Sequence, residues 1–259
     1  MHSSESMHVV DSVHALIEAA RLAQQHFGVN AWFRGHARSH WQLQSTSARR
    51  YSGSSDRDRR KAELSLAIQF QIRATGIHSL APAVDDWAEW LALMRHYGLP
   101  VCLMDWSESV LVAGFFAVWN RSEDDVDGML WALFPGRLNQ LEADLASPFM
   151  CNATAPLLEN ELVDLQAGEL GASDKVLAYL PHHRDARQVA QQSAFTIHRS
   201  STPLEARLSG ESTLLRFRIP ADKKQQVRAG LLTAGIRRTS LFPDLEHLAY
   251  ELTEDNHFA

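Results

Sequence analysis

The sequence predicts an α+β fold, with a mixed or antiparallel sheet core flanked by helices. Short apolar segments with strand character are scattered among helical segments, which argues against a regularly alternating α/β sheet. The 259 residues are 45% hydrophobic, enough to bury a large core in one compact unit. No repeat or low-complexity tract is present, which argues against a solenoid. We therefore expect a single domain over residues 1–259.

Helical segments are indicated by apolar residues at helical spacing and by residues that begin or end helices. The first covers residues 11–27, where Asp11 and Ser12 can cap its start and Gly28 ends it. The other candidates are residues 61–75 and 85–97, with residues 109–119 either helical or simply buried.

Strands are expected where short apolar runs end at glycine or proline. These runs are "AWFRG" at 31–35, "GMLWALF" at 128–134 and "STLLRFRIP" at 212–220. The segment 48–61 is rich in Ser, Gly and Arg and is expected to be a polar loop. Its positive charges suit a phosphate or RNA, although such a cluster is more often a solvated loop.

Charge and cysteine content narrow the function classes. A formal net charge of -6 argues against electrostatic binding of nucleic acid along the whole chain. Two cysteines are too few for a disulfide framework, so a reducing cytoplasmic location is expected. The N-terminus lacks the pattern of a signal peptide, and we expect no membrane span.

The apolar run 90–119 contains two polar residues that need an explanation, His96 and Asp105. A buried imidazole or carboxylate costs free energy unless it is paired or performs a function. His96 at a helix end suits capping, with ligand contact or acid-base chemistry as the alternative. Asp105 must find a partner, and an arginine or a backbone turn would supply one.

Arg34 at the end of the first predicted strand is a candidate anion clamp. Its planar guanidinium can bind phosphate or carboxylate through two parallel hydrogen bonds, and Gly35 allows backbone or ligand to approach closely. An internal ion pair with Asp105 or Asp185 is the alternative, and the two roles are compatible.

Several motifs resemble, in order and spacing, the FRG domain family, named for its Phe-Arg-Gly motif. Residues 30–120 match best and residues 185–249 form a second matched part. Two departures are Ser193, where the family usually has glycine, and the Cys102 and Met104 flanks. The matching motifs are "WFRG" at 32–35, Trp41, Leu43, "HYGLP" at 96–100, "LMDWS" at 103–107, Phe116, "RQVAQQSAF" at 187–195 and "GIRRTSLFPDLEHLA" at 235–249.

The opening strand is also similar, more weakly, to that of ADP-ribosyltransferases, whose arginine holds the phosphates or ribose of NAD. That resemblance implies a middle strand at 193–198 and a catalytic acid, Glu246, although an acid at a helix start is the common alternative. Together with the residue patterns above, this gives Arg34, Glu246 and His96 as the expected catalytic residues. The expected substrate-binding residues are Trp32, Gly35, Tyr97, Asp105, Gln191, Phe195 and Thr196.

The implied function is that of an NAD-using enzyme, an ADP-ribosyltransferase or NAD glycohydrolase, acting as a bacterial toxin or phage-defence effector. NAD would be its substrate, a protein or nucleic acid its target, and an immunity or antitoxin protein its partner. No metal is expected, although His182, His183 and Asp185 lie close in sequence. The alternative is a non-enzymatic module that binds a nucleotide, nucleic acid or protein through Arg34 and the basic segment 48–61.

Overall fold

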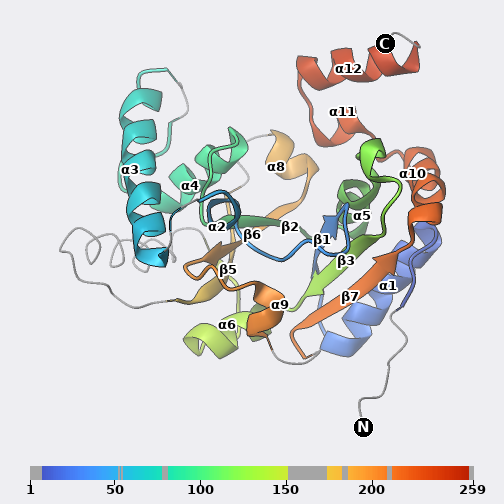
Figure 1. Ribbon diagram of the computed structural model, residues 1–259, viewed down its shortest axis with the longest axis horizontal. Helices are drawn as coiled ribbons and strands as arrows, with labels where there is room; N and C mark the ends of the chain where they lie inside the picture. The colour runs from blue at the N-terminus through green and yellow to red at the C-terminus, as the bar shows by residue number, and fades with distance from the viewer. Residues whose placement is uncertain are drawn as a thin grey trace.

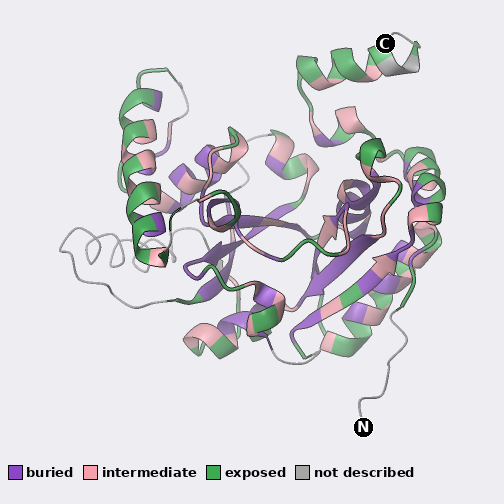
Figure 2. Ribbon diagram, viewed as in Figure 1, coloured by how far each residue is buried: buried purple, intermediate pink, exposed green. Residues whose placement is uncertain are grey.

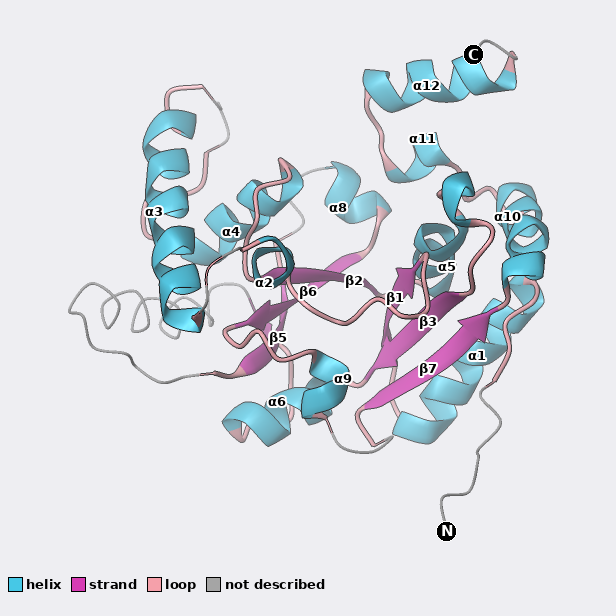
Figure 3. Ribbon diagram, in the orientation of Figure 1, coloured by secondary structure: helices cyan, strands magenta, loops and turns pink. Residues whose placement is uncertain are grey.

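The fold is built on one seven-stranded sheet with strand order β4-β5-β6-β2-β1-β3-β7 (Figure 3). The computed structural model describes residues 8–51, 53, 55–77, 81–150, 174–182, 186–208 and 212–256. Neighbouring strands are antiparallel except for β4 and β5, which confirms the predicted α+β class with a mixed sheet. The strands are β1 (Trp32–His36), β2 (Leu103–Ser107), β3 (Gly128–Leu133), β4 (Phe149–Met150), β5 (Val176–Leu180), β6 (Ser193–His198) and β7 (Leu214–Ile219).

Helices pack on both faces of this sheet (Figure 1). The predicted first helix is confirmed, because Ser12 caps its start and Gly28 ends it with a left-handed φ of 74°. Helices over 85–97 and 109–119 are confirmed as well. The helices are α1 (Val13–Phe27), α2 (Thr46–Arg50), α3 (Asp56–Ala74), α4 (Trp87–His96), α5 (Val110–Val118), α6 (Pro135–Ala143), α8 (Ala186–Ala190), α9 (Leu204–Arg207), α10 (Lys224–Thr233), α11 (Arg238–Leu241) and α12 (Leu245–Asp255).

The prediction of a polar loop over 48–61 was wrong, because the chain there enters α2 and α3. Ser55 caps α3 by accepting a hydrogen bond from the main chain of Asp58. Arg59 and Arg60 are buried, and both donate to the main-chain carbonyl of Arg199. Two of the charges assigned to a solvated basic segment therefore hold the fold together.

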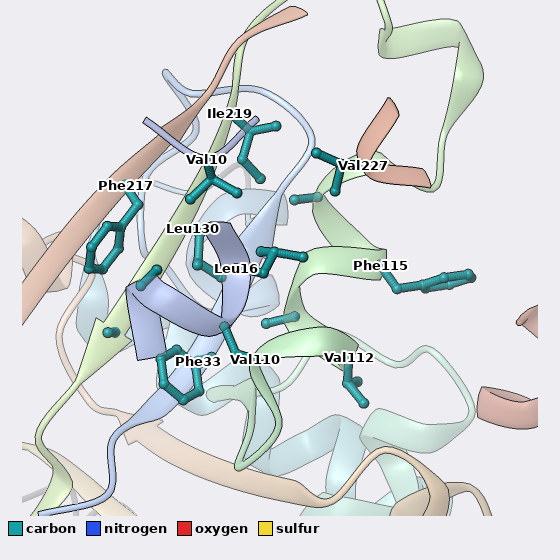
Figure 4. Packing of buried hydrophobic residues seen from close by; sticks show 14 of the residues in the cluster. Val10, Leu16, Phe33, Val110, Val112, Phe115, Leu130, Phe217, Ile219 and Val227 are labelled. Carbon is teal, nitrogen blue, oxygen red and sulfur yellow. The ribbon is translucent and has the colours of Figure 1, made fainter. Parts of the chain in front are cut away.

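The register of the strands assigns their side chains to two faces. Phe33 lies opposite Ala132, and Leu130 lies opposite Phe217, so all four point to the same face. They form one apolar cluster with residues of α1, α5 and α10, such as Leu16 (Figure 4). One end of this face is therefore covered by those three helices.

A second cluster covers the other end of the same face. It joins Leu103, Phe195 and Ile197 of the sheet to Ala92 and Met94 of α4. The opposite face packs against α6 and α9. Most residues of the strands are buried (Figure 2). Helix α4 and the group formed by α1, α5 and α10 thus cover neighbouring parts of one face. The central strands β1 and β2 lie where these two parts meet.

The ladder between β1 and β2 is much shorter than its neighbours. Only Phe33 and Ser107 are paired there, whereas five residue pairs join β1 to β3 and five join β2 to β6. The two strands therefore diverge beyond this pair. No helix in the described part of the chain is long and apolar enough to cross a membrane.

Candidate functional site

A pocket of about 280 Å³ lies at the divergence of β1 and β2. Its walls come from β1, β2, β6, α2, α4, α5 and α8, so residues far apart in sequence meet there. Among the described residues that line it, the charged and titratable ones are Arg34, Arg49, Arg95, Arg187, Asp105, His36 and His96.

Arg34 is held in place from two sides. Its Nε donates to Nε2 of His36 at 3.1 Å, and its Nη1 donates to the main-chain oxygen of Asp105 at 2.5 Å. Nη1 also lies 3.8 Å from the Asp105 carboxylate, and the side chain is 16% exposed. Burial lowers the pKa of Arg34 to about 10, so the guanidinium remains charged at neutral pH. Its Nη2 makes no hydrogen bond to any described residue and remains available to a ligand.

Asp105 is the carboxylate of the pocket, and Arg95 is its main partner. Nε and Nη2 of Arg95 both donate to Oδ2 of Asp105, at 2.9 and 2.5 Å. Burial would raise the pKa of Asp105, but Arg95 and Arg34 outweigh it and hold that pKa below its usual range. The lowered pKa keeps the carboxylate ionised at neutral pH. Its side chain is 39% exposed and therefore accessible.

Arg49 from α2 differs from Arg34 and Arg95 because no described residue accepts a hydrogen bond from its side chain. Burial lowers its pKa, Arg95 lowers it further, and Asp105 offsets part of this effect. A guanidinium beside like charges, without a carboxylate of its own, is stabilised when an anion enters. Among the described lining residues, Arg34, Arg49 and Arg95 thus share the single carboxylate of Asp105.

The aromatic part of the lining includes Trp41, Trp106, Phe116 and Phe195. Trp41 lies at the rim with 40% of its surface exposed. Large aromatic faces next to a cationic surface are the usual means of holding a planar ring that carries phosphate.

The wall formed by α8 is tied to the C-terminal segment. Gln191 donates to the main-chain oxygen of Leu241 at 3.0 Å and accepts from the Ser107 hydroxyl through its own carbonyl at 2.7 Å. The Arg187 guanidinium lies 4.6 Å from the centre of the Phe242 ring. Residues 187–195 therefore line the pocket, and Leu241 and Phe242 support this wall from outside.

The structure brings six of the ten expected site residues to this pocket and leaves four outside its lining. Trp32 and Thr196 are buried on the face of the sheet that packs against α6 and α9. Thr196 accepts a hydrogen bond there from Trp106. Tyr97 follows the end of α4 and is mostly exposed, and Glu246 is exposed in the first turn of α12. The six that line the pocket are Arg34, Gly35, His96, Asp105, Gln191 and Phe195.

Gly35 lines the pocket, but its lack of a side chain is required by α5. A Cβ placed there would lie 1.9 Å from the main-chain oxygen of Ala113. The glycine of the Phe-Arg-Gly motif therefore allows a helix to contact the strand directly. Asp185, proposed as another partner of Arg34, lies outside the described residues, as does His183.

Sequence reasoning missed His36, Arg95 and Arg187 as site residues, and it considered Arg49 only as one charge of the basic segment 48–61. His36 stands two residues after Arg34 in a strand, a spacing that places both on one face. Arg95 stands beside His96 in the matched segment, and this neighbourhood was the available signal. No group of three or more metal-ligating side chains occurs in the described ranges.

Comparison with known proteins identifies the part of the chain that builds this pocket. Residues 29–126 match the model of the FRG domain. The chain carries an FRG domain. The matched range supplies β1, β2, α2, α4 and α5, and so most of the pocket, while α8 and β6 lie beyond the FRG match. Searches of curated proteins and of solved structures return no match.

Proposed function

We propose that the FRG domain binds a nucleotide in this pocket, with its phosphate on the arginines, and that the ligand is NAD. The observation that carries the proposal is the set of four arginines around one carboxylate among the described lining residues. Arginine binds phosphate through two parallel hydrogen bonds, and this geometry is stronger and more specific than a contact with a single charge.

The size of the pocket supports one nucleotide unit. Sites for small molecules span about 300 to 1,000 Å³, and this pocket, at about 280 Å³, lies just below that range. One half of NAD would occupy the pocket, and the other half would extend through its opening.

The proposed reaction is cleavage of the bond between nicotinamide and ribose. That step passes through a state resembling an oxocarbenium ion, which a nearby carboxylate stabilises. Asp105 is the described carboxylate that lines the pocket, so we assign it this role in place of Glu246. Arg34 and Arg49 would hold the phosphates, and water or a macromolecule would accept the ADP-ribose.

A protein that consumes NAD suits the proposed role of a bacterial toxin or phage-defence effector. Inducing the wild-type chain in a bacterial host should slow growth and deplete NAD, whereas Arg34→Lys should do neither. Equal growth and equal NAD content with both chains would remove this role from the proposal.

Binding without chemistry is the second candidate, and the pairing of Asp105 favours it. A carboxylate held by Arg95 through two hydrogen bonds to one oxygen is partly neutralised, which weakens its stabilisation of a cationic transition state. The pocket would then recognise a nucleotide as a signal.

Free nicotinamide, measured after incubation of the pure protein with NAD, distinguishes the two. The enzymatic proposal predicts nicotinamide release by the wild type and at least a tenfold loss in Asp105→Asn, in the range of electrostatic catalysis. Binding of NAD with no release would support the non-enzymatic candidate. Neither binding nor release would refute the assignment of NAD.

A further inference from the structure

His36 contacts both the arginine and the tryptophan of the pocket. Its Nε2 accepts from Nε of Arg34 at 3.1 Å. Its Nδ1 lies 3.1 Å from the main-chain oxygen of Trp41. The imidazole ring also packs against the Trp41 indole, with the ring centres 6.1 Å apart and the planes at 68°. One side chain, 4% exposed, thus connects two groups that come from different parts of the wall.

These two contacts fix the same tautomer of His36. A guanidinium can only donate, so Nε2 must be unprotonated to accept from Arg34. A carbonyl oxygen can only accept, so Nδ1 must carry the proton that it donates to Trp41. Burial, followed by the charge of Arg34, lowers the pKa of His36 to about 3, so the ring is neutral at physiological pH.

The contact with Nε determines which edge of Arg34 a ligand meets. Nε is used by His36 and Nη1 by the Asp105 carbonyl, which leaves Nη2 for the pocket. The second contact holds the backbone of Trp41, whose ring lies partly exposed at the rim. Without His36, the guanidinium could rotate and the segment that carries Trp41 would lose an anchor.

We propose that His36 is a positioning residue, which sets Arg34 to hold a phosphate and Trp41 to stack on a ring of the same ligand. This inference rests on the proposed nucleotide-binding function and adds a residue and an orientation to it. The ligand would lie with its phosphate at the β1 and β2 divergence and one ring against Trp41.

Three substitutions separate positioning from simple packing. His36→Gln can retain an acceptor near Arg34 but loses the donor to Trp41. His36→Asn can retain the donor but does not reach Arg34. His36→Phe fills the volume and makes neither hydrogen bond. The exposed His40, in the loop that follows β1, provides the control His40→Gln.

We expect NAD affinity to fall about threefold in His36→Gln, about tenfold in His36→Asn and about thirtyfold in His36→Phe, following the hydrogen bonds lost. His40→Gln should bind like the wild type. A packing role alone would make His36→Phe the least affected variant. Wild-type affinity in His36→Phe, or that reversed order, would overturn the proposal.

A measurement without ligand keeps this inference separate from the proposed function. Nitrogen NMR of the free wild-type protein should show a neutral His36 protonated at Nδ1, with slow exchange of the Arg34 Nε proton. His36→Gln should retain that slow exchange, and His36→Phe should lose it. If NAD does not bind the wild type, the NAD assignment fails, and the exchange rates still decide the role of His36. Equal exchange in wild type and His36→Phe would overturn it.

Discussion

At the scale of single residues, the position of Arg34 is compatible with both of the roles that its sequence context allows. It lies near the Asp105 carboxylate, as an internal ion pair requires, and it also lines a pocket. The ion pair uses one side of the guanidinium and leaves another side for a ligand. A structural role and a ligand-binding role are therefore compatible in this residue.

Replacing Arg34 with lysine should weaken NAD binding about tenfold or more, because lysine keeps the charge and loses the planar fork. Unfolding free energy should also fall by about 1 to 2 kcal/mol, since one ammonium cannot serve both His36 and the Asp105 carbonyl. Calorimetric titration and urea unfolding measure the two effects. Unchanged affinity in a folded Arg34→Lys protein would contradict a phosphate contact.

Asp105→Asn should lower the free energy of unfolding by about 1 to 3 kcal/mol at pH 7, because Arg95 and Arg34 lose their counter-charge. The folded pKa of Asp105 lies below the unfolded value, so its contribution is present above about pH 4 and disappears as the pH falls through the folded pKa. Urea unfolding at a series of pH values tests this. A constant difference between wild type and variant across that range would contradict the ionised pair.

At the scale of elements, the contact between α5 and β1 depends on Gly35. The helix lies so close that only a hydrogen fits in place of a side chain. This contact holds α5 against the strand beside the pocket, so the helix that forms one wall is positioned by the same motif that contains Arg34.

Gly35→Ala should therefore prevent stable folding or lower the melting temperature strongly, since the nearest atoms to the new Cβ are backbone atoms of α5. Gly98→Ala is the matched control. Gly98 has a φ of 78° and open space around its Cβ position, so alanine should cost only about 1 kcal/mol of backbone strain. Circular dichroism melting compares them. Similar melting temperatures for both variants would contradict the close contact.

Elements with strong local signals could be predicted from the sequence, and elements without them could not. Ser12 and Gly28 defined α1, and the short apolar run at 128–134 defined β3. Residues 48–61 were misjudged because Ser and Gly outweighed the caps at Ser45 and Ser55, which begin α2 and α3. The burial of Arg59 depends on the carbonyl of Arg199, 140 residues away, and local patterns contain no such information.

Some residues of the candidate site could likewise be found from local sequence, and others could not. Arg34 and Asp105 were found because each is a charge within an apolar motif. Arg49 was considered as part of the basic segment 48–61 and Arg187 as part of a family motif, but only the fold brings their segments together at one pocket. Glu246 was chosen by its position relative to a family pattern, and it lies exposed on α12 outside the pocket lining.

At the scale of the whole molecule, two buried neutral histidines make stability depend on pH. Burial lowers the pKa of both His36 and His198 to about 3. Both take up a proton on unfolding below their ordinary pKa of about 6.5, whereas the folded chain does not bind it until about pH 3. Their contribution is complete above about pH 6.5 and is lost as the pH falls.

The free energy of unfolding should therefore decrease by about 1.4 kcal/mol per pH unit for each of these histidines as the pH falls from roughly 6 to 4. Urea unfolding across that range measures the slope. His198→Gln should reduce this slope by about 1.4 kcal/mol per pH unit, the contribution of one proton, whatever the substitution does to the free energy of unfolding at pH 7. The exposed His40→Gln should not change the slope. A slope unchanged by His198→Gln would contradict a buried neutral imidazole.

The central claim is that unbalanced arginine charge in the pocket binds the phosphate of NAD, and Arg49 tests it most directly. Arg49 and Arg50 are neighbours on α2, but only Arg49 is among the residues that line the pocket. Calorimetric titration with NAD should show binding that is about tenfold weaker in Arg49→Gln, the loss of a charge-assisted hydrogen bond, and unchanged in Arg50→Gln. Equal affinity in all three proteins, or no binding by the wild type, would contradict the claim.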